Sequence, residues 1–400
     1  MTSAPQHGAA GQAAGYIFQA QWALLELLKR VSSAPNDLMR LEQLDDIEFE
    51  SAGQNVELLQ VKHSLHAVAD LTDGSRNLWS TLAVWMDHLR QSPQTELPRL
   101  TLVTTGIAPP GSAAALLRPE HRDVDRALGI LESAATSLQS NETKAAREQF
   151  IGLPPESRYR LVAAITMVDG VVRVDEFAKR LREELVHALP GGLEVPFVER
   201  VLGWWWSSAV RLLTGDLVGI TPGEVQMFID DLRDQFGPEN LPTDVDIETF
   251  DEAAIRGYSD RRFVKQLHLI AFSSGQLRLA IHAYHLAFTQ RSRWLREELV
   301  GLHELEDFEK RLRFEWRYAF EDMIAALPRD ASPQDKEEAG RALLNQLIDG
   351  SRVRIRDRYE ESFMTRGSLH GLADDPKQDV GWHPEFREHL GRMLLGEAAG

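Results

Sequence analysis

The sequence predicts an α/β N-terminal core with a helical extension, followed by a mostly α-helical C-terminal domain. Three observations lead to this prediction. Between residues 15 and 106 the apolar pattern changes in the order helix, strand, strand, helix, strand. Residues 113–235 have almost wholly helical periodicity, and helical apolar stripes recur beyond residue 250.

The first helix is expected from Gly15 to about Arg30, where apolar side chains recur at helical spacing. Residues 1–14 contain no basic segment followed by an apolar core, so they are not a secretory signal. We expect these residues to form a short flexible lead-in.

A two-stranded hairpin is expected at about residues 40–63, with a Gly-containing turn between its strands. Successive side chains of a strand point to opposite faces. On the second strand, Gln60 and Lys62 therefore share one face, while Leu59 and Val61 share the other.

The first strand of this hairpin follows an acidic cluster. Its apolar residues take one face, which places Asp46 rather than Asp45 on the opposite, polar face. Glu48 and Glu50 share the face of Asp46, and we expect both to be solvated.

One face of the hairpin therefore gathers a carboxylate, an amide oxygen and an ammonium group, from Asp46, Gln60 and Lys62. A carboxylate and a hard oxygen ligand hold Mg²⁺, which promotes phosphodiester hydrolysis. The spacing alone also fits a half-exposed sheet that ends in Gln-x-Lys, with the Asp pair forming only a turn. Both interpretations stay open on these residues.

After the hairpin we expect a helix around residues 78–89, a strand at 100–105 and a long helical region. We assign 15–220 to the N-terminal domain with its helical extension. Residues 221–250 are rich in Asp, Glu and Pro and are expected to be a linker, with the boundary near 237–250. Residues 251–400 form the helical C-terminal domain.

The composition excludes several classes of functional site. The chain has no cysteine, which excludes disulfides, thiolate zinc sites and cysteine nucleophiles, and fits a reducing, cytoplasmic location. No apolar run approaches the roughly eighteen residues that cross a bilayer, so no membrane association is expected. The net charge of −17 weakens attraction to nucleic acid, so contact with DNA must depend on local patches, metal or assembly.

Two histidines of the C-terminal domain, His370 and His383, are candidate metal ligands. Since no acidic or cysteine partner stands at ligand spacing, we interpret both as structural histidines.

The N-terminal region resembles the PD-(D/E)xK nuclease core, in the variant where glutamine replaces the second acidic residue. It is most similar to the endonuclease domain of antiviral effectors associated with cyclic-nucleotide signalling and of Lamassu systems. The matching residues follow the order of that domain: Gly15-Tyr16-Ile17-Phe18-Gln19, Glu42, Asp45-Asp46-Ile47, Gln60-Val61-Lys62 and the strand Leu100 to Gly106.

This resemblance implies a Mg²⁺-dependent DNA endonuclease, in which Mn²⁺ can substitute, acting on double-stranded DNA. Asp46, Gln60 and Lys62 are the implied catalytic residues. The implied metal positions are Asp46, Gln60 and Val61. Supporting roles fall to Gln19, Glu42 and Asp45.

The C-terminal region resembles the domain shared by effector subunits of ABC-three-component systems, to which Lamassu belongs. The resemblance rests on segments spread through the domain: Phe263 to Ile270, Tyr284 to Trp294, the helix of Trp316, Gly367-Ser368-Leu369-His370, Leu372-Ala373 and Gly381-Trp382-His383-Pro384. It implies docking to an SMC-like or ABC-type ATPase and a small middle subunit, and release to form an active homo-oligomer.

Two other functions stay open from the sequence. The chain could be a non-catalytic component that recognises DNA or bridges subunits. It could also be a nuclease for RNA or single strands, although no aromatic and basic cluster lies on the strands.

Overall fold

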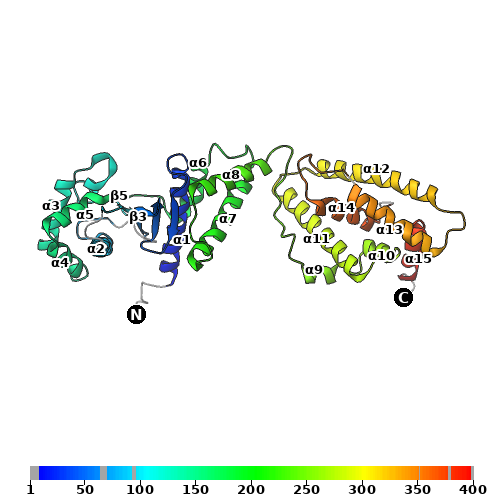
Figure 1. The fold of residues 1–400 in the computed structure, drawn as a ribbon, viewed down its shortest axis with the longest axis horizontal. Coiled ribbons are helices and arrows are strands. Elements are labelled where there is room, and N and C mark those ends of the chain that lie inside the picture. The colour runs from blue at the N-terminus through cyan, green and yellow to red at the C-terminus, as the bar shows by residue number, and fades with distance from the viewer. Residues whose placement is uncertain (1–8, 64–69, 92–95, 351, 377–379, 398–400) are drawn as a thin grey trace, which may run out of the picture. The chain divides into compact units, whose positions relative to one another are not determined.

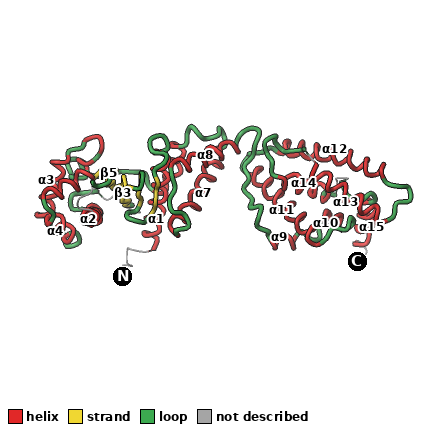
Figure 2. Tube along the Cα trace, viewed as in Figure 1, coloured by secondary structure: helices red, strands yellow, loops and turns green. Residues whose placement is uncertain are grey.

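The computed structural model describes residues 9–63, 70–91, 96–350, 352–376 and 380–397. The chain divides into two compact units, Met1–Asp231 and Leu232–Gly400. Within the described residues, the strands all belong to the first unit, and the second consists of helices and loops (Figures 1 and 2). The predicted α/β N-terminal part and helical C-terminal part are therefore confirmed.

The first unit contains helices α1 to α7, most of helix α8, five strands and three short 3₁₀ helices. In chain order these are α1 (Ala9–Arg30), β1 (Leu38–Leu41), β2 (Ile47–Ser51), β3 (Gln54–Lys62), α2 (Arg76–Gln91), β4 (Arg99–Thr104), η1 (Ala115–Leu117), η2 (Pro119–His121), α3 (Val124–Ser137), α4 (Lys144–Gly152), α5 (Pro155–Ala164), β5 (Ile165–Val168), η3 (Val174–Glu176), α6 (Phe177–Glu184), α7 (Glu194–Thr214) and α8 (Pro222–Gln235).

The strands form one sheet in the order β1-β2-β3-β4-β5. The pairs β1/β2 and β2/β3 are antiparallel, whereas β3/β4 and β4/β5 are parallel. Ile47 pairs with Leu59, so Asp46 lies across from Gln60. The predicted hairpin thus has the register that brings the two polar side chains together.

Helices cover both faces of the sheet. On one face, Leu58, Leu100 and Leu102 join a buried core with side chains of α2, α3, α4 and α5. On the other face α1 packs against β3 (Figure 1), and the Arg30 guanidinium lies 3.9 Å from the centre of the Phe49 ring. Because both faces are covered, a polar residue in the middle of the sheet is buried.

Two strands of the sheet were not predicted. The edge strand β1 precedes the hairpin, and β5 interrupts a region expected to be almost wholly helical. β5 has only four residues and directly follows α5, so its alternation of buried Ile165 and Met167 with half-buried neighbours is too short to stand out.

The first helix begins earlier than predicted. α1 starts at Ala9, so residues 9–14 are helical and not a flexible lead-in. Alanine, which dominates this stretch, has the highest helix propensity. The remaining part of the predicted lead-in, residues 1–8, lies outside the described residues.

The second unit is a helical domain. Its helices are α9 (Glu252–Gly257), α10 (Arg262–His268), α11 (Ser274–Arg296), α12 (Leu302–Ala326), α13 (Pro333–Gly350), α14 (Ser362–Asp374) and α15 (Phe386–Glu397). α11 and α14 pack closely, and a Cβ at Gly367 would lie 2.6 Å from the Cβ of Ala287. The Trp294, Trp316 and Trp382 side chains are buried in its core.

The stretch predicted as a linker, 221–250, is structured. Residues 222–235 form α8, and the segment after it belongs to the second unit and packs against α11. The buried Gln290 side chain donates to the Pro242 carbonyl oxygen at 3.2 Å and accepts from the Asp244 backbone N–H at 2.8 Å. Trp294 Nε1 also donates to that carbonyl at 2.8 Å. Prolines and acids stop helix formation here, but side chains of α11 hold the extended backbone.

None of the helices among the described residues combines the length and the apolar composition that a bilayer-spanning segment requires.

Candidate active site

The candidate site lies at the carboxyl end of β3, where the loop between β1 and β2 approaches it. This loop, residues 42–46, is closed by a hydrogen bond from the Glu42 backbone N–H to the Asp46 carbonyl oxygen, at 3.2 Å. Glu42 has a φ of 55°, which non-glycine residues seldom adopt outside tight turns. The loop thus turns sharply and brings two adjacent carboxylates to the sheet.

Gln19 of α1 fixes the loop from the side. Its buried amide nitrogen donates to Glu42 Oε1 at 2.8 Å and to the Asp46 carbonyl oxygen at 2.6 Å. One side chain therefore holds the first and last residues of the loop. The structure brings Gln19 and Glu42 into the candidate site as supporting residues.

Asp45 is buried, and both of its carboxylate oxygens are occupied. Oδ1 accepts hydrogen bonds from the Gln60 amide and from the Asp46 backbone N–H. Oδ2 accepts one at 2.9 Å from the Trp85 indole of α2. The sequence pattern does not link Trp85 to the site, because this tryptophan stands in an apolar helical stripe and carries no charge. With its oxygens engaged, Asp45 is suited to positioning Gln60.

Asp46 is half-buried and faces Gln60 and Val61. Its Oδ2 accepts from the Val61 backbone N–H at 2.7 Å, and its Oδ1 lies 3.4 Å from the Gln60 amide nitrogen. Burial raises the pKa of Asp46 to about 6, although the Val61 N–H and the Lys62 ammonium act to lower it. A cation beside this carboxylate would favour its ionised form.

Gln60 is buried between the carboxylates and the core. Its amide nitrogen contacts Asp45 and Asp46, whereas its Oε1 is buried with no hydrogen-bond partner among the described residues. A buried oxygen that accepts no hydrogen bond lowers the stability of the fold. The same oxygen is available as a ligand for a hard cation.

Lys62 ends β3 on the same face as Gln60, and it pairs with Thr104 of β4. Its side chain is half-buried and borders a cavity of about 240 Å³. Arg76, at the start of α2, and Gly106 also line this cavity. Two cationic side chains thus border an open space next to the acidic group.

The three predicted catalytic side chains therefore lie at one end of β3, together with their predicted supporting residues. Val61 contributes its N–H to Asp46. This contact orients the carboxylate. The metal position expected at Val61 would use its backbone carbonyl oxygen and stays a prediction.

The expected solvation of Glu48 and Glu50 is wrong. Glu48 is 1% exposed, and both carboxylates pair with Arg40, Glu48 at 3.5 Å. The reason is the unpredicted strand β1, whose register places Arg40 opposite Glu48. Burial raises the pKa of Glu48, which the nearby Arg40 opposes.

Comparison with known proteins matches the second unit only. No curated protein and no solved structure matches the chain. Residues 263–390 match the family model of C-terminal domain 7 of the ABC-three component systems. The matched region runs from α10 into α15. Through this C-terminal domain, the chain is a component of an ABC-three component system.

Proposed function

We propose that this chain is the DNA-cleaving subunit of an ABC-three-component antiviral defence system, and that it uses Mg²⁺. The observation that supports this most strongly is the convergence of Asp46, Gln60 and Lys62 at one end of β3. The order helix, hairpin, helix, parallel strand also fits the PD-(D/E)xK core that the N-terminal sequence resembles.

In this proposal Asp46 and Gln60 would hold the metal through Oδ1 and Oε1, with Val61 as the third predicted metal position. Both atoms suit a hard cation, because carboxylate and amide oxygens are the ligands that Mg²⁺ prefers. When bound, the ion neutralises phosphate charge and lowers the pKa of a bound water. Mn²⁺ accepts the same ligands and can substitute.

The other residues of the site position the metal ligands or stabilise charge on the phosphate. Asp45, held by Trp85, orients the Gln60 amide. Gln19 keeps the loop 42–46 closed, so that Asp46 faces β3. The Lys62 ammonium stabilises the charge that develops on the phosphate, or positions the attacking water.

DNA is the proposed substrate, in its double-stranded form, even though the chain carries a net charge of −17. Lys62 and Arg76 border the cavity beside the acidic site and offer two local cations to a phosphate. Affinity beyond this small patch would come from assembly, which places several sites on one duplex. We therefore propose that an SMC-like or ABC-type ATPase and a small middle subunit hold the chain, and that its release yields an active homo-oligomer.

The test is cleavage of plasmid DNA by purified full-length protein, alone and with its partner subunits, in Mg²⁺ or EDTA. We expect Lys62→Ala to reduce cleavage about a hundredfold or more, because one preorganised charge is lost. Lys144→Ala is the matched control, since Lys144 is an exposed lysine on α4 paired only with Glu148 in the described structure. It should cleave at the wild-type rate.

Lys62→Ala protein that cleaves like wild type, or wild-type cleavage unaffected by EDTA, would refute the proposed site. Cleavage of RNA or single strands but not of plasmid would favour the second nuclease function. DNA binding without cleavage under every condition would favour a recognition or bridging role. Light scattering after size exclusion, run beside the assay, tests the proposed homo-oligomer.

A further inference from the structure

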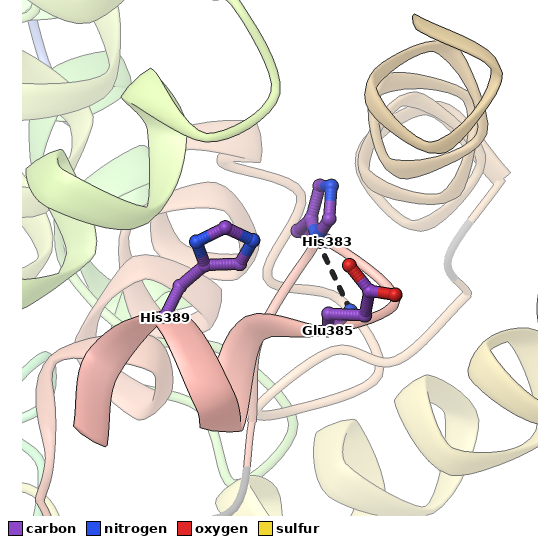
Figure 3. A group of neighbouring side chains, drawn as sticks. All are labelled: His383, Glu385 and His389. Atoms are coloured by element: carbon purple, nitrogen blue, oxygen red, sulfur yellow. Dashed lines mark hydrogen bonds between the residues drawn. The ribbon is translucent and has the colours of Figure 1, made fainter. Parts of the chain in front are cut away.

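Three side chains of the second unit form a cluster with the chemistry of a transition-metal site. His383 and Glu385 lie in the turn before α15, and His389 lies in the first turns of that helix. Each offers one ligand atom, and these atoms lie within 4.8 Å of one another. In Figure 3 the Glu385 and His389 side chains rise from the ribbon on either side of His383.

The local sequence brings the three together. Glu385 and His389 are four residues apart, the spacing that puts two side chains on one helical face. The His389 backbone N–H donates to the Glu385 carbonyl oxygen at 3.2 Å, so this first turn is formed. The sequence interpretation of His383 as structural rested on the lack of an acidic partner at ligand spacing. Glu385, two residues along the chain, is such a partner.

The turn is held in place from several directions. The Trp316 indole donates to the Gly381 carbonyl oxygen at 2.9 Å. Phe386 packs edge-on against Trp316, with ring centres 6.2 Å apart. A Cβ at Gly340 of α13 would lie 2.9 Å from the Trp382 carbonyl oxygen, so α13 closely approaches the turn. Ligands on a rigid support lose little entropy on binding an ion.

The hydrogen bonding at the cluster also suits a metal. The Glu385 backbone N–H donates to His383 Nδ1 at 3.1 Å, so this nitrogen carries a lone pair and no proton. A metal ion that replaces this contact would meet an available ligand atom.

We propose that His383, Glu385 and His389 bind one divalent transition-metal ion, with Zn²⁺ as the preferred class. Two imidazoles and a carboxylate are an established zinc ligand set, whereas Mg²⁺ and Ca²⁺ prefer oxygen ligands. Zinc–ligand distances of about 2.0–2.2 Å place ligand atoms about 3.3 Å apart. Small side-chain rotations would therefore complete the site, with the ion replacing the N–H contact of His383.

The charges facing the cluster come from α13, which contributes Lys336 and Glu337. Lys336 forms an ion pair with Glu385, so the metal displaces an ammonium from this carboxylate. A bound ion would fasten α15 to the turn that precedes it. Three protein ligands leave a fourth position for water or for a side chain of a partner subunit.

The experiment measures Zn²⁺ binding to tag-free full-length protein by competition with a chromophoric chelator. Asp46→Asn serves as the background, so that the acidic site of the first unit does not contribute. We expect one ion per chain, visible d–d absorption when Co²⁺ replaces Zn²⁺, and a higher melting temperature with Zn²⁺. His389→Ala and Glu385→Gln should each weaken binding by at least about tenfold and abolish the thermal shift.

His303→Ala is the matched control, because His303 is 82% exposed and lies 3.3 Å from Asp307. It should bind Zn²⁺ like the background protein. Equal affinity in the background and in His389→Ala would overturn the proposal. So would a loss in His303→Ala as large as that in His389→Ala. These measurements do not depend on DNA cleavage. They therefore test the metal site independently of the proposed nuclease function.

Discussion

At the scale of single residues, Asp46 links stability to the proposed chemistry. Burial raises its pKa to about 6, above the 3.8 of an ordinary aspartate. The folded state therefore favours the protonated form. The stability that protonated Asp46 contributes is fully present below pH 4 and is lost as the pH rises towards 6. When no cation is bound, the buried Asp46 carboxylate therefore destabilises the folded protein above about pH 6.

Asp46→Asn should remove this pH dependence while it stops cleavage. Two pKa units correspond to about 3 kcal/mol, and solvent contact at this half-buried group reduces the effect to about 1–2 kcal/mol. In EDTA, the variant should gain stability over wild type as the pH rises from 4 to 6. Thermal unfolding across that range measures the difference, with exposed Asp87→Asn as control. A difference that stays flat with pH would contradict the assigned burial effect.

The sequence predicted much of this residue-scale arrangement. Strand alternation placed Asp46, Gln60 and Lys62 on one face, and the β2/β3 register agrees. What alternation could not predict is what covers that face. Trp85 reaches Asp45 from forty residues away, and Arg40 neutralises Glu48 from an unpredicted strand. Both contacts depend on tertiary packing rather than on local pattern.

At the scale of elements, short pieces escaped prediction where long ones did not. The periodic helices α11 and α12 have 23 and 25 residues, and their stripes repeat through several turns. β5 has four residues, too few for a period to emerge. The segment after α8 lacks periodicity altogether, and its order comes from Gln290 and Trp294 of α11.

The contact between α11 and α14 depends on a glycine. A Cβ at Gly367 would collide with the Ala283 carbonyl group and lie 2.6 Å from the Ala287 Cβ. Gly367→Ala should therefore destabilise the second unit by at least about 2 kcal/mol, since backbone cannot yield as a side chain can. Thermal or urea unfolding of the full chain measures this loss.

Gly371→Ala is the matched control, one turn further along α14. A Cβ there would meet only the Tyr284 ring, at 3.8 Å, which is ordinary van der Waals contact. Because alanine favours helix over glycine by about 1 kcal/mol, this variant should be neutral or more stable. Equal effects of the two substitutions would show that α11 and α14 do not pack as closely as described.

At the scale of the whole molecule, the chain combines an α/β unit with a helical unit, and part of the helical unit matches a known family model. The match at residues 263–390 covers no residue of the candidate active site. The second unit thus contains a domain type that ABC-three component systems share. Binding of partner subunits is the role that we propose for it.

The second unit should fold alone, but only if it begins before the predicted boundary at 251. A fragment of residues 251–400 lacks the backbone that satisfies Gln290 and Trp294, both fully buried. Each buried polar group left unpaired costs about 1–3 kcal/mol. We therefore expect residues 232–400 to melt cooperatively and at a clearly higher temperature than residues 251–400. Equal melting temperatures would show that the segment 232–250 does not stabilise the second unit.

The same fragment tests how the molecule is controlled. The proposed nuclease would be toxic and would need an off state, which docking through a separate unit would provide without any change at Asp46 or Lys62. Residues 232–400 should therefore co-purify with the proposed ATPase and small middle subunit, whereas residues 1–231 should not. The measurement is co-expression with both partners, followed by affinity capture of each fragment. Capture by the first unit alone would place docking in the α/β unit, and would leave the helical unit without its proposed role.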